Sequence, residues 1–257
     1  MKKYCKDLTV SAVEYPADGY VLLKLTDAVP LPDIKAGQFV EIRVDNSRQT
    51  FLRRPISVHF VDRIENTLWL LIQVVGEGTR SLLSLNAGDT LNVLFPLGNG
   101  FSQGMKGETV LLVGGGVGIA PLLEYGNQLR AAGAVPVFLL GGRSQCNLLE
   151  LERYKALGEV YVTTEDGSLG ERGFVTQHSM LDHVAFDRIS CCGPKPMMMA
   201  VARWAHQHGT LCEVSLENMM ACGLGACLCC VEKTVKGNVC VCKEGPVFNI
   251  EQLTWQI

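Results

Sequence analysis

The sequence lacks several features that would place it in a common class of protein. No apolar run approaches the roughly 20 residues that cross a bilayer, and one of the longest covers only residues 68–72. The formal net charge of -3 provides no basic field for nucleic acid or anionic lipid. The five histidines form no catalytic pattern, and no nucleophile motif or acid–base pair of carboxylates stands out. A polyanion-binding protein and an acid–base catalyst are therefore disfavoured.

Cysteine is nearly absent from the first 190 residues, which contain only Cys5 and Cys146. Nine further cysteines fall between Cys191 and Cys242. The basic start leads into no apolar stretch, so we expect a protein that is not exported and stays in the cytoplasm. Disulfides rarely persist in that compartment. The clustered thiols therefore indicate metal or redox chemistry.

The first hundred residues contain short β-rich runs separated by turn residues, at residues 21–25, 38–42, 55–59, 68–75 and 91–94. This spacing favours an antiparallel barrel or sandwich. The breaker at residues 96–100 is typical of a domain exit. We expect a first domain over residues 1–102.

After residue 103 the pattern changes to strands that alternate with helix-length segments, which predicts a parallel, doubly wound sheet over residues 103–214. The expected strands are residues 110–113, 135–140, 160–163, 188–191 and 211–214, and the expected helices are residues 121–132, 148–157, 175–183 and 197–208. The remaining residues, 215–257, are too few to build a good core alone. A metal cluster is a natural organiser for this third domain.

The strongest motif is formed by Cys222, Cys227 and Cys230, whose C-x4-C-x2-C spacing is that of plant-type [2Fe-2S] clusters. Such a cluster needs four thiolates because each iron is tetrahedral and prefers soft sulfur ligands. The fourth thiolate comes later, and spacing alone does not choose between Cys240 and Cys242, which would face the same way on an extended strand.

Two alternatives compete with the iron–sulfur interpretation. A structural zinc site prefers C-x2-C pairs set well apart, which the x4 loop fits poorly. A thiol-rich core without metal is also possible, since unpaired cysteine is often buried.

A glycine-rich turn at residues 113–123 follows a strand and opens a helix. Gly116 and Gly118 would let a diphosphate approach the backbone at the helix N-terminus. The sequence departs from strict G-x-G-x-x-G, because Ala120 and Pro121 occupy the place of the third glycine. A tight turn without a ligand is the alternative.

Two further segments could contact a dinucleotide. Arg54-Pro55-Ile56-Ser57 could supply a cation for a flavin diphosphate and contacts along its ring, although a basic pair on a strand is more often a solvated edge. Cys192-Gly193-Pro194 joins a strand to a helix at the carboxyl edge of the parallel sheet, where ligands bind. A plain loop is the alternative there.

Taken together, these motifs resemble the ferredoxin reductase superfamily, and within it the family of electron transfer subunits of dihydroorotate dehydrogenase B. The resemblance covers essentially the whole chain, and its most specific part is the run that follows Cys242 and contains Gly-Pro-Val-Phe. It implies an FAD-binding barrel, a nicotinamide-binding domain and a small [2Fe-2S] domain. It also implies a site for each cofactor. FAD would be contacted by Arg54, Pro55, Ile56, Ser57, Leu71, Ile72, Gln73, Gly78 and Thr79; NAD by Gly116, Gly118, Cys192, Gly193 and Pro194; and the cluster by Cys222, Cys227, Cys230 and Cys242. One departure is Gln73, which stands where many members carry a basic residue.

The resemblance also implies a partner and a route for electrons. A catalytic subunit with FMN would oxidise dihydroorotate in pyrimidine biosynthesis, and its electrons would pass through the cluster and FAD to NAD+. The complex would be a heterotetramer with two copies of each chain. The C-terminal cluster domain would lie at its interface, and exposed apolar residues such as Trp255 would contribute to it.

Two other functions remain open on the sequence alone: a reductase subunit of a sulfite reductase or bifurcating transhydrogenase, and a zinc-stabilised binding module. The sequence also leaves NAD and NADP unresolved, because residues 140–143 contain no acidic residue.

Overall fold

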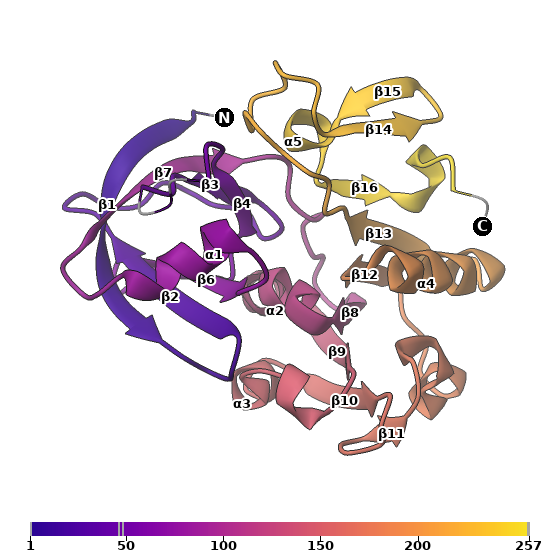
Figure 1. Cartoon of the computed structure of the whole chain (residues 1–257). Helices are drawn as coiled ribbons and strands as arrows, with labels where there is room; N and C mark the ends of the chain where they lie inside the picture. The colour runs from indigo at the N-terminus through magenta and orange to yellow at the C-terminus, as the bar shows by residue number, and fades with distance from the viewer. Residues whose placement is uncertain (1, 46, 48, 256–257) are drawn as a thin grey trace.

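The computed structural model describes residues 2–45, 47 and 49–255. In this part of the chain a curled antiparallel sheet lies beside a parallel sheet flanked by helices, and a C-terminal segment with a two-stranded sheet lies next to both (Figure 1). No helix among these residues is long and apolar enough to span a membrane.

The curled sheet contains seven strands in the order β4-β3-β7-β1-β2-β6-β5, and β4 comes back into contact with β6. Its elements are β1 (Tyr4–Glu14), β2 (Tyr20–Thr26), β3 (Phe39–Ile42), β4 (Arg54–Ser57), β5 (Phe60–Asp62), β6 (Thr67–Gln73), α1 (Glu77–Ser81), the 3-10 turn η1 (Leu82–Ser84) and β7 (Thr90–Leu97). The five strands expected from the sequence are confirmed. Strand β1 was missed although it pairs with both β2 and β7; only Leu8 and Val10 of its side chains are buried.

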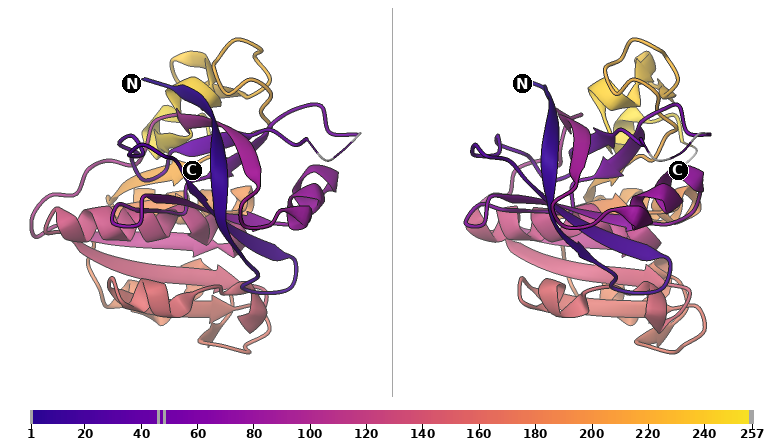
Figure 2. Two further views of the ribbon diagram at one scale, coloured as in Figure 1. Left: turned by 90° about the vertical axis from the view of Figure 1, so that its left-hand side faces the viewer. Right: turned by 60° about the vertical axis from the view of Figure 1, so that its left-hand side comes forward.

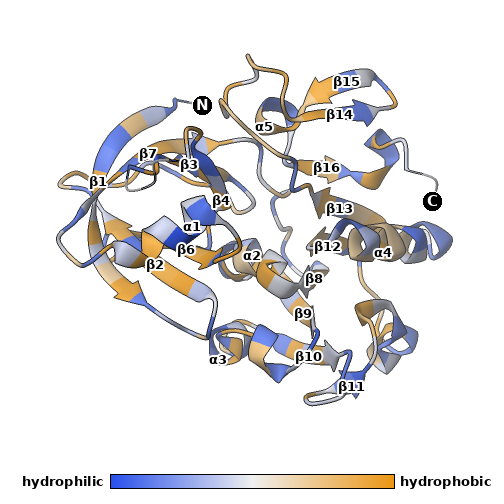
Figure 3. Cartoon of the chain, in the orientation of Figure 1, coloured by the Kyte–Doolittle hydropathy of each residue, from blue (hydrophilic) through white to orange (hydrophobic). Residues whose placement is uncertain are grey.

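Apolar side chains fill the inside of the curled sheet. Leu23, Val40, Leu70 and Phe95 come from four different strands and are all fully buried. Figure 3 shows hydrophobic residues along β2 and β6, which lie side by side in this sheet. The β-rich runs of the sequence therefore form one core.

The second sheet is doubly wound, as expected. Its order is β11-β10-β9-β8-β12-β13-β16, and all pairings are parallel except that of β13 with β16. Helices α2 and α3 pack on one face and α4 on the other (Figures 1 and 2). The elements are β8 (Thr109–Gly115), η2 (Gly116–Ile119), α2 (Ala120–Ala131), β9 (Val135–Gly142), η3 (Gln145–Asn147), α3 (Leu151–Lys155), β10 (Glu159–Thr164), β11 (Glu171–Arg172), β12 (Arg188–Cys192), α4 (Lys195–Gln207) and β13 (Leu211–Ser215).

The helix predicted at residues 175–183 is wrong. This segment forms two 3-10 turns, η4 (Val175–Gln177) and η5 (Ser179–Asp182). His178 between them has an extended backbone, and its ring Nδ1 accepts a hydrogen bond from Met180 N at 3.0 Å. The Glu171 carboxylate accepts another from Ser179 N at 2.9 Å. Local side-chain acceptors therefore take N–H groups that a helix would have used.

The C-terminal segment shares its core with the parallel sheet. It contains β14 (Val231–Thr234), β15 (Gly237–Cys240), α5 (Val241–Glu244), β16 (Val247–Asn249) and η6 (Ile250–Gln252). Val241 and Phe248 pack in the same buried cluster as Met198 of α4, and β16 adds a strand to the edge of the parallel sheet. This confirms the expectation that some 40 residues build no core of their own, while the three domain boundaries stay a prediction.

Candidate redox and nucleotide sites

The cysteine-rich loop connects β13 to β14 and packs against the curled sheet. Gly223 and Gly225 have φ values of 64° and 83°, which glycine adopts without steric cost. A Cβ atom at Gly223 would lie 2.9 Å from both Glu41 Cγ and Leu97 Cδ1. This glycine therefore permits the close approach of the loop to β3 and β7.

Three of the four predicted ligand sulfurs accept backbone hydrogen bonds. Leu224 N donates to Cys222 Sγ at 3.3 Å, Gly225 N donates to Cys242 Sγ at 3.1 Å, and Cys242 N donates to Cys230 Sγ at 3.4 Å. Cys230 and Cys242 are buried, whereas Cys227 is exposed. N–H groups aimed at thiolate sulfur tune iron–sulfur clusters, so this part of the loop fits such a group.

Backbone hydrogen bonds and burial give the thiols different pKa values. Burial disfavours ionisation of Cys222, but the backbone N–H groups of Leu224, Cys227 and Ala226 outweigh it and lower the pKa of this thiol to about 6. Burial, followed by the contact with Cys230, raises the pKa of Cys242 to about 12. A cationic metal centre would have to displace that proton.

Cys240 and Cys242 do not lie on one extended strand, as the prediction assumed, but both thiols lie near Cys230 and Gly225. Cys240 ends β15, and the backbone turns into α5 at Val241. Cys242 lies in the buried core, while Cys240 is half-buried, with its Sγ 3.8 Å from Gly225 O. The deeper burial of Cys242 favours it as the fourth ligand, and the choice between the two thiols stays a prediction.

Within the described residues, no three His, Cys, Asp or Glu side chains have the geometry of a single metal ion site. The four-cysteine ligand set therefore stays a prediction, supported by burial and by hydrogen bonds to sulfur.

The predicted flavin residues gather along β4 and its neighbours. All four residues of β4 are half-buried. A Cβ at Gly78 would lie 2.5 Å from Arg54 Nε, so the α1 turn and the Arg54 side chain are in contact. In the described part of the chain, the only hydrogen bond that Arg54 donates goes to Arg53 O, at 3.3 Å. Its guanidinium retains donors for an anionic ligand.

The other predicted flavin residues differ in accessibility. Leu71 and Ile72 are buried in β6, and Gln73 is half-buried. The Thr79 hydroxyl is already used, because it accepts from Gly76 N at 3.1 Å and donates to Gly76 O. Thr79 therefore stabilises the turn before α1, and its backbone is the part left for a ligand.

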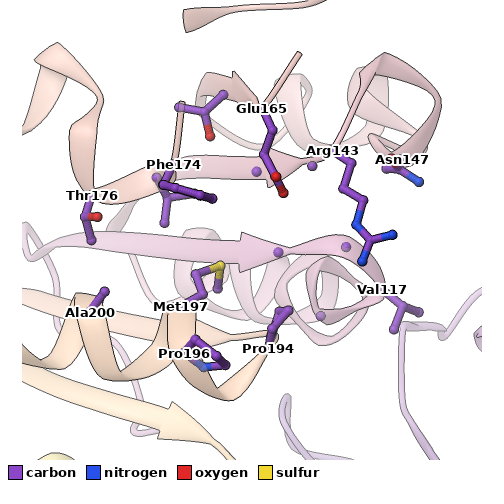
Figure 4. Close-up of a pocket in the computed structure, with 18 of the residues that line it drawn as sticks. Val117, Arg143, Asn147, Glu165, Phe174, Thr176, Pro194, Pro196, Met197 and Ala200 are labelled. Atoms are coloured by element: carbon purple, nitrogen blue, oxygen red, sulfur yellow. The ribbon is translucent and has the colours of Figure 1, made fainter. Parts of the chain in front are cut away.

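A cavity of about 680 Å³ lies at the carboxyl ends of the parallel strands (Figure 4). Of the predicted NAD residues, Gly116, Gly118, Gly193 and Pro194 line it. Cys192 does not, because it is a buried residue of β12. A Cβ at Gly118 would lie 2.5 Å from Cys192 O and Gly193 Cα. The absence of a side chain therefore lets the two loops of the cavity meet.

Several lining residues were not predicted. Tyr20 and the predicted flavin residue Gln73 reach the cavity from the curled sheet, so this sheet forms part of its wall. Arg143 and Glu165, from the loops after the neighbouring strands β9 and β10, lie on the same side of the cavity in Figure 4. Their positions directly after expected strands were the available signal. Glu217, which follows β13, also lines the cavity. It belongs to no motif, so nothing in the sequence indicated this role.

The curled sheet also contains an unexpected buried carboxyl. Glu41 of β3 is fully buried, and neither of its carboxyl oxygens has a hydrogen-bond partner among the described residues. Burial raises its pKa to about 7, with nearby Arg53 opposing this. Only a charged residue inside an otherwise apolar run marks this position in the sequence.

In comparison with known proteins, the chain matches two family models. Residues 217–254 match the iron–sulfur cluster binding domain of dihydroorotate dehydrogenase B, and residues 112–203 match the oxidoreductase NAD-binding domain.

Whole-chain relatives agree with these models. A dihydroorotate dehydrogenase B (NAD(+)) electron transfer subunit from Fusobacterium nucleatum is 40% identical over 220 residues, which cover 82% of this chain and 84% of the relative. The subunit of the same description from Shouchella clausii is 36% identical and covers 98% of both chains. Among solved structures, a chain of an NADH-dependent reduced ferredoxin-NADP oxidoreductase matches with a TM-score of 0.85 at 30% identity, over 96% of this chain and 90% of that one.

Proposed function

Because the chain belongs to the family of electron transfer subunits of dihydroorotate dehydrogenase B, we propose that it passes electrons from a dihydroorotate-oxidising, FMN-containing subunit to NAD+. It is an oxidoreductase subunit of pyrimidine biosynthesis that uses a [2Fe-2S] cluster, FAD and NAD. When bound, the cluster carries single electrons and FAD exchanges hydride with the nicotinamide.

The observation that carries this proposal is the adjacency of the three candidate sites. Gly223 of the cysteine loop packs on Glu41 of β3, and β3 pairs with β4, the predicted flavin strand. Gln73, at the end of β6, is a predicted flavin residue and also lines the nucleotide cavity, so it belongs to both sites. Cysteine loop, flavin strand and nucleotide cavity therefore follow one another without an intervening layer of structure.

Each group of residues has a proposed role. Cys222, Cys227, Cys230 and Cys242 hold the cluster. Arg54 neutralises the FAD diphosphate, while the rest of β4, the Gly78–Thr79 turn and the end of β6 hold the flavin. Gly116 and Gly118 admit the NAD diphosphate, and Gly193 and Pro194 line the opposite wall.

The partner subunit would dock on the cysteine loop. Met219, Leu224 and Leu228 are 83%, 47% and 65% exposed, and they flank the exposed Cys227. Trp255 is not the exposed residue expected from the sequence, because it is half-buried against the core and its Nε1 is inaccessible. We place the interface on the cysteine loop of the cluster domain, without Trp255, in a cytoplasmic heterotetramer with two copies of each chain.

One alternative partner has structural support. The similarity to an NADH-dependent reduced ferredoxin-NADP oxidoreductase at 30% identity fits a reductase subunit that serves a bifurcating enzyme. The cofactor sites would be the same, and the partner chain would differ.

The proposed cofactor sites are tested by anaerobic purification of the intact complex, followed by measurement of flavin, iron, acid-labile sulfide and zinc. We expect FAD together with iron and sulfide in equal amounts. Cys227→Ser should keep FAD and lose iron. A colourless complex that contains zinc but neither flavin nor iron would refute the proposal.

A further inference from the structure

In the part of the chain that the structure describes, three charged side chains line the nucleotide cavity, and they lie at opposite ends of it. Arg143 follows β9 and Glu165 follows β10, whereas Glu217 follows β13. The strand order β10-β9-β8-β12-β13 puts the glycine turn after β8 between them. One carboxyl therefore stands alone on the β12–β13 side.

The topology indicates which end of a dinucleotide meets each side. A dinucleotide crosses the point where the strand order reverses, with its diphosphate on the glycine turn after the first strand. In this fold the adenosine ribose lies by the second strand, which here is β9. The nicotinamide half must then extend over β12 and β13, where Gly193, Pro194 and Glu217 line the cavity.

The Glu217 carboxylate can accept a hydrogen bond at this end of the cavity. It is open to the cavity, and within the described residues its one polar contact is the Cys192 thiol, 4.0 Å from Oε1. The surrounding protein raises the pKa of its carboxyl through desolvation. Among the described residues, no arginine or lysine lines this end of the cavity.

We propose that Glu217 binds the nicotinamide carboxamide by accepting a hydrogen bond from its NH2 group. This inference rests on the proposed function, since it requires a nicotinamide dinucleotide in the cavity. Glu217 would thus be a binding residue for one end of the ligand. Glu165, at the other end, would not meet the nicotinamide.

The test compares NAD+ with ADP-ribose, which lacks the nicotinamide, as ligands of the intact oxidised complex in calorimetric titrations. Glu217→Ala should weaken NAD+ binding by about three- to tenfold, the cost of one hydrogen bond, and leave ADP-ribose binding unchanged. Glu217→Gln should lose less, because its amide keeps an acceptor oxygen. Flavin and iron contents of each variant confirm that the cofactors are retained.

Glu165→Gln is the matched control, and any change it causes should be equal for the two ligands. If Glu217→Ala weakens both ligands equally, or neither, the proposal is overturned. If the unaltered complex binds neither ligand, the proposed function itself fails.

Discussion

The buried carboxyl of Glu41 makes the stability of this protein depend on pH. The side chain is fully buried without a hydrogen-bond partner among the described residues, and burial raises its pKa from 4.5 to about 7. Below pH 4.5 the carboxyl is neutral in both the folded and the unfolded chain. Between pH 4.5 and about 7 the unfolded chain releases this proton while the folded chain keeps it, so the folded state becomes less favoured.

Glu41→Gln removes this penalty with little change of shape. The difference between 4.5 and about 7 corresponds to about 3 kcal/mol, at about 1.4 kcal/mol for each tenfold change in proton affinity. We therefore compare the free energy of unfolding of Glu41→Gln with that of the natural chain at two pH values. The difference in favour of the variant should be about 3 kcal/mol larger at pH 8 than at pH 4. Anaerobic urea titrations of the two proteins in parallel provide the measurement.

Glu124→Gln is the matched control, because burial also raises the pKa of Glu124 but that carboxylate has partners. It accepts from Gln128 Nε2 at 2.7 Å and from Val61 N at 3.2 Å. Its amide replacement should be destabilising at pH 8. Infrared spectra offer a second readout: a carboxylic acid band absent from Glu41→Gln should fade as the pH rises through about 7. A constant stability difference between pH 4 and pH 8 would refute the reasoning.

Three further predictions concern the cofactor sites. Cys242→Ser should abolish iron binding while Cys240→Ser keeps it, measured as iron per chain, because Cys242 is buried beside Cys230 and its sulfur accepts a hydrogen bond from Gly225 N, whereas Cys240 is only half-buried; full iron content in Cys242→Ser would contradict the ligand set. Arg54→Ala should lower FAD content at nearly unchanged stability. Arg53→Ala should be destabilising by about 1–3 kcal/mol, since the Arg53 guanidinium donates to Glu41 O and Asn92 O. The reverse pattern would show that Arg53 binds FAD and that Arg54 stabilises the sheet. Gly118→Ala should weaken NAD+ binding at least tenfold in calorimetry, because the new Cβ would meet Cys192 O at 2.5 Å; unchanged affinity would show that this turn does not contact the dinucleotide.

Periodicity predicted the two large sheets because their strands are apolar and bounded by turn residues. It missed β1, in which only Leu8 and Val10 are buried although its backbone pairs on both sides. It also placed a helix at residues 175–183, where the His178 ring and the Glu171 carboxylate capture backbone N–H groups. Hydrogen bonds between strand backbones, and side chains that accept hydrogen bonds from nearby backbone N–H groups, cannot be read from hydrophobic periodicity.

The residues of the candidate sites also differ in whether the sequence indicates them. Cysteine spacing and glycine turns are local signals, so Cys222, Cys227, Cys230 and Gly118 could be predicted from the sequence as site residues. Glu41 and Glu217 could not, because their significance depends on contacts made through folding. Gly223 meets Glu41 only when the cysteine loop packs on β3, and Glu217 enters the cavity only when β13 lies beside β12.

The central claim is that this chain connects dihydroorotate oxidation to NAD+ through its own cofactors. The most direct measurement is anaerobic co-expression with the dihydroorotate-oxidising subunit, followed by an assay of NADH formation from dihydroorotate and NAD+. We predict that the complex forms NADH, that neither subunit does so alone, and that a complex with Cys227→Ser loses this activity while it still oxidises dihydroorotate with an artificial dye. A complex that contains FAD and iron, oxidises dihydroorotate with the dye and yet forms no NADH would contradict the account.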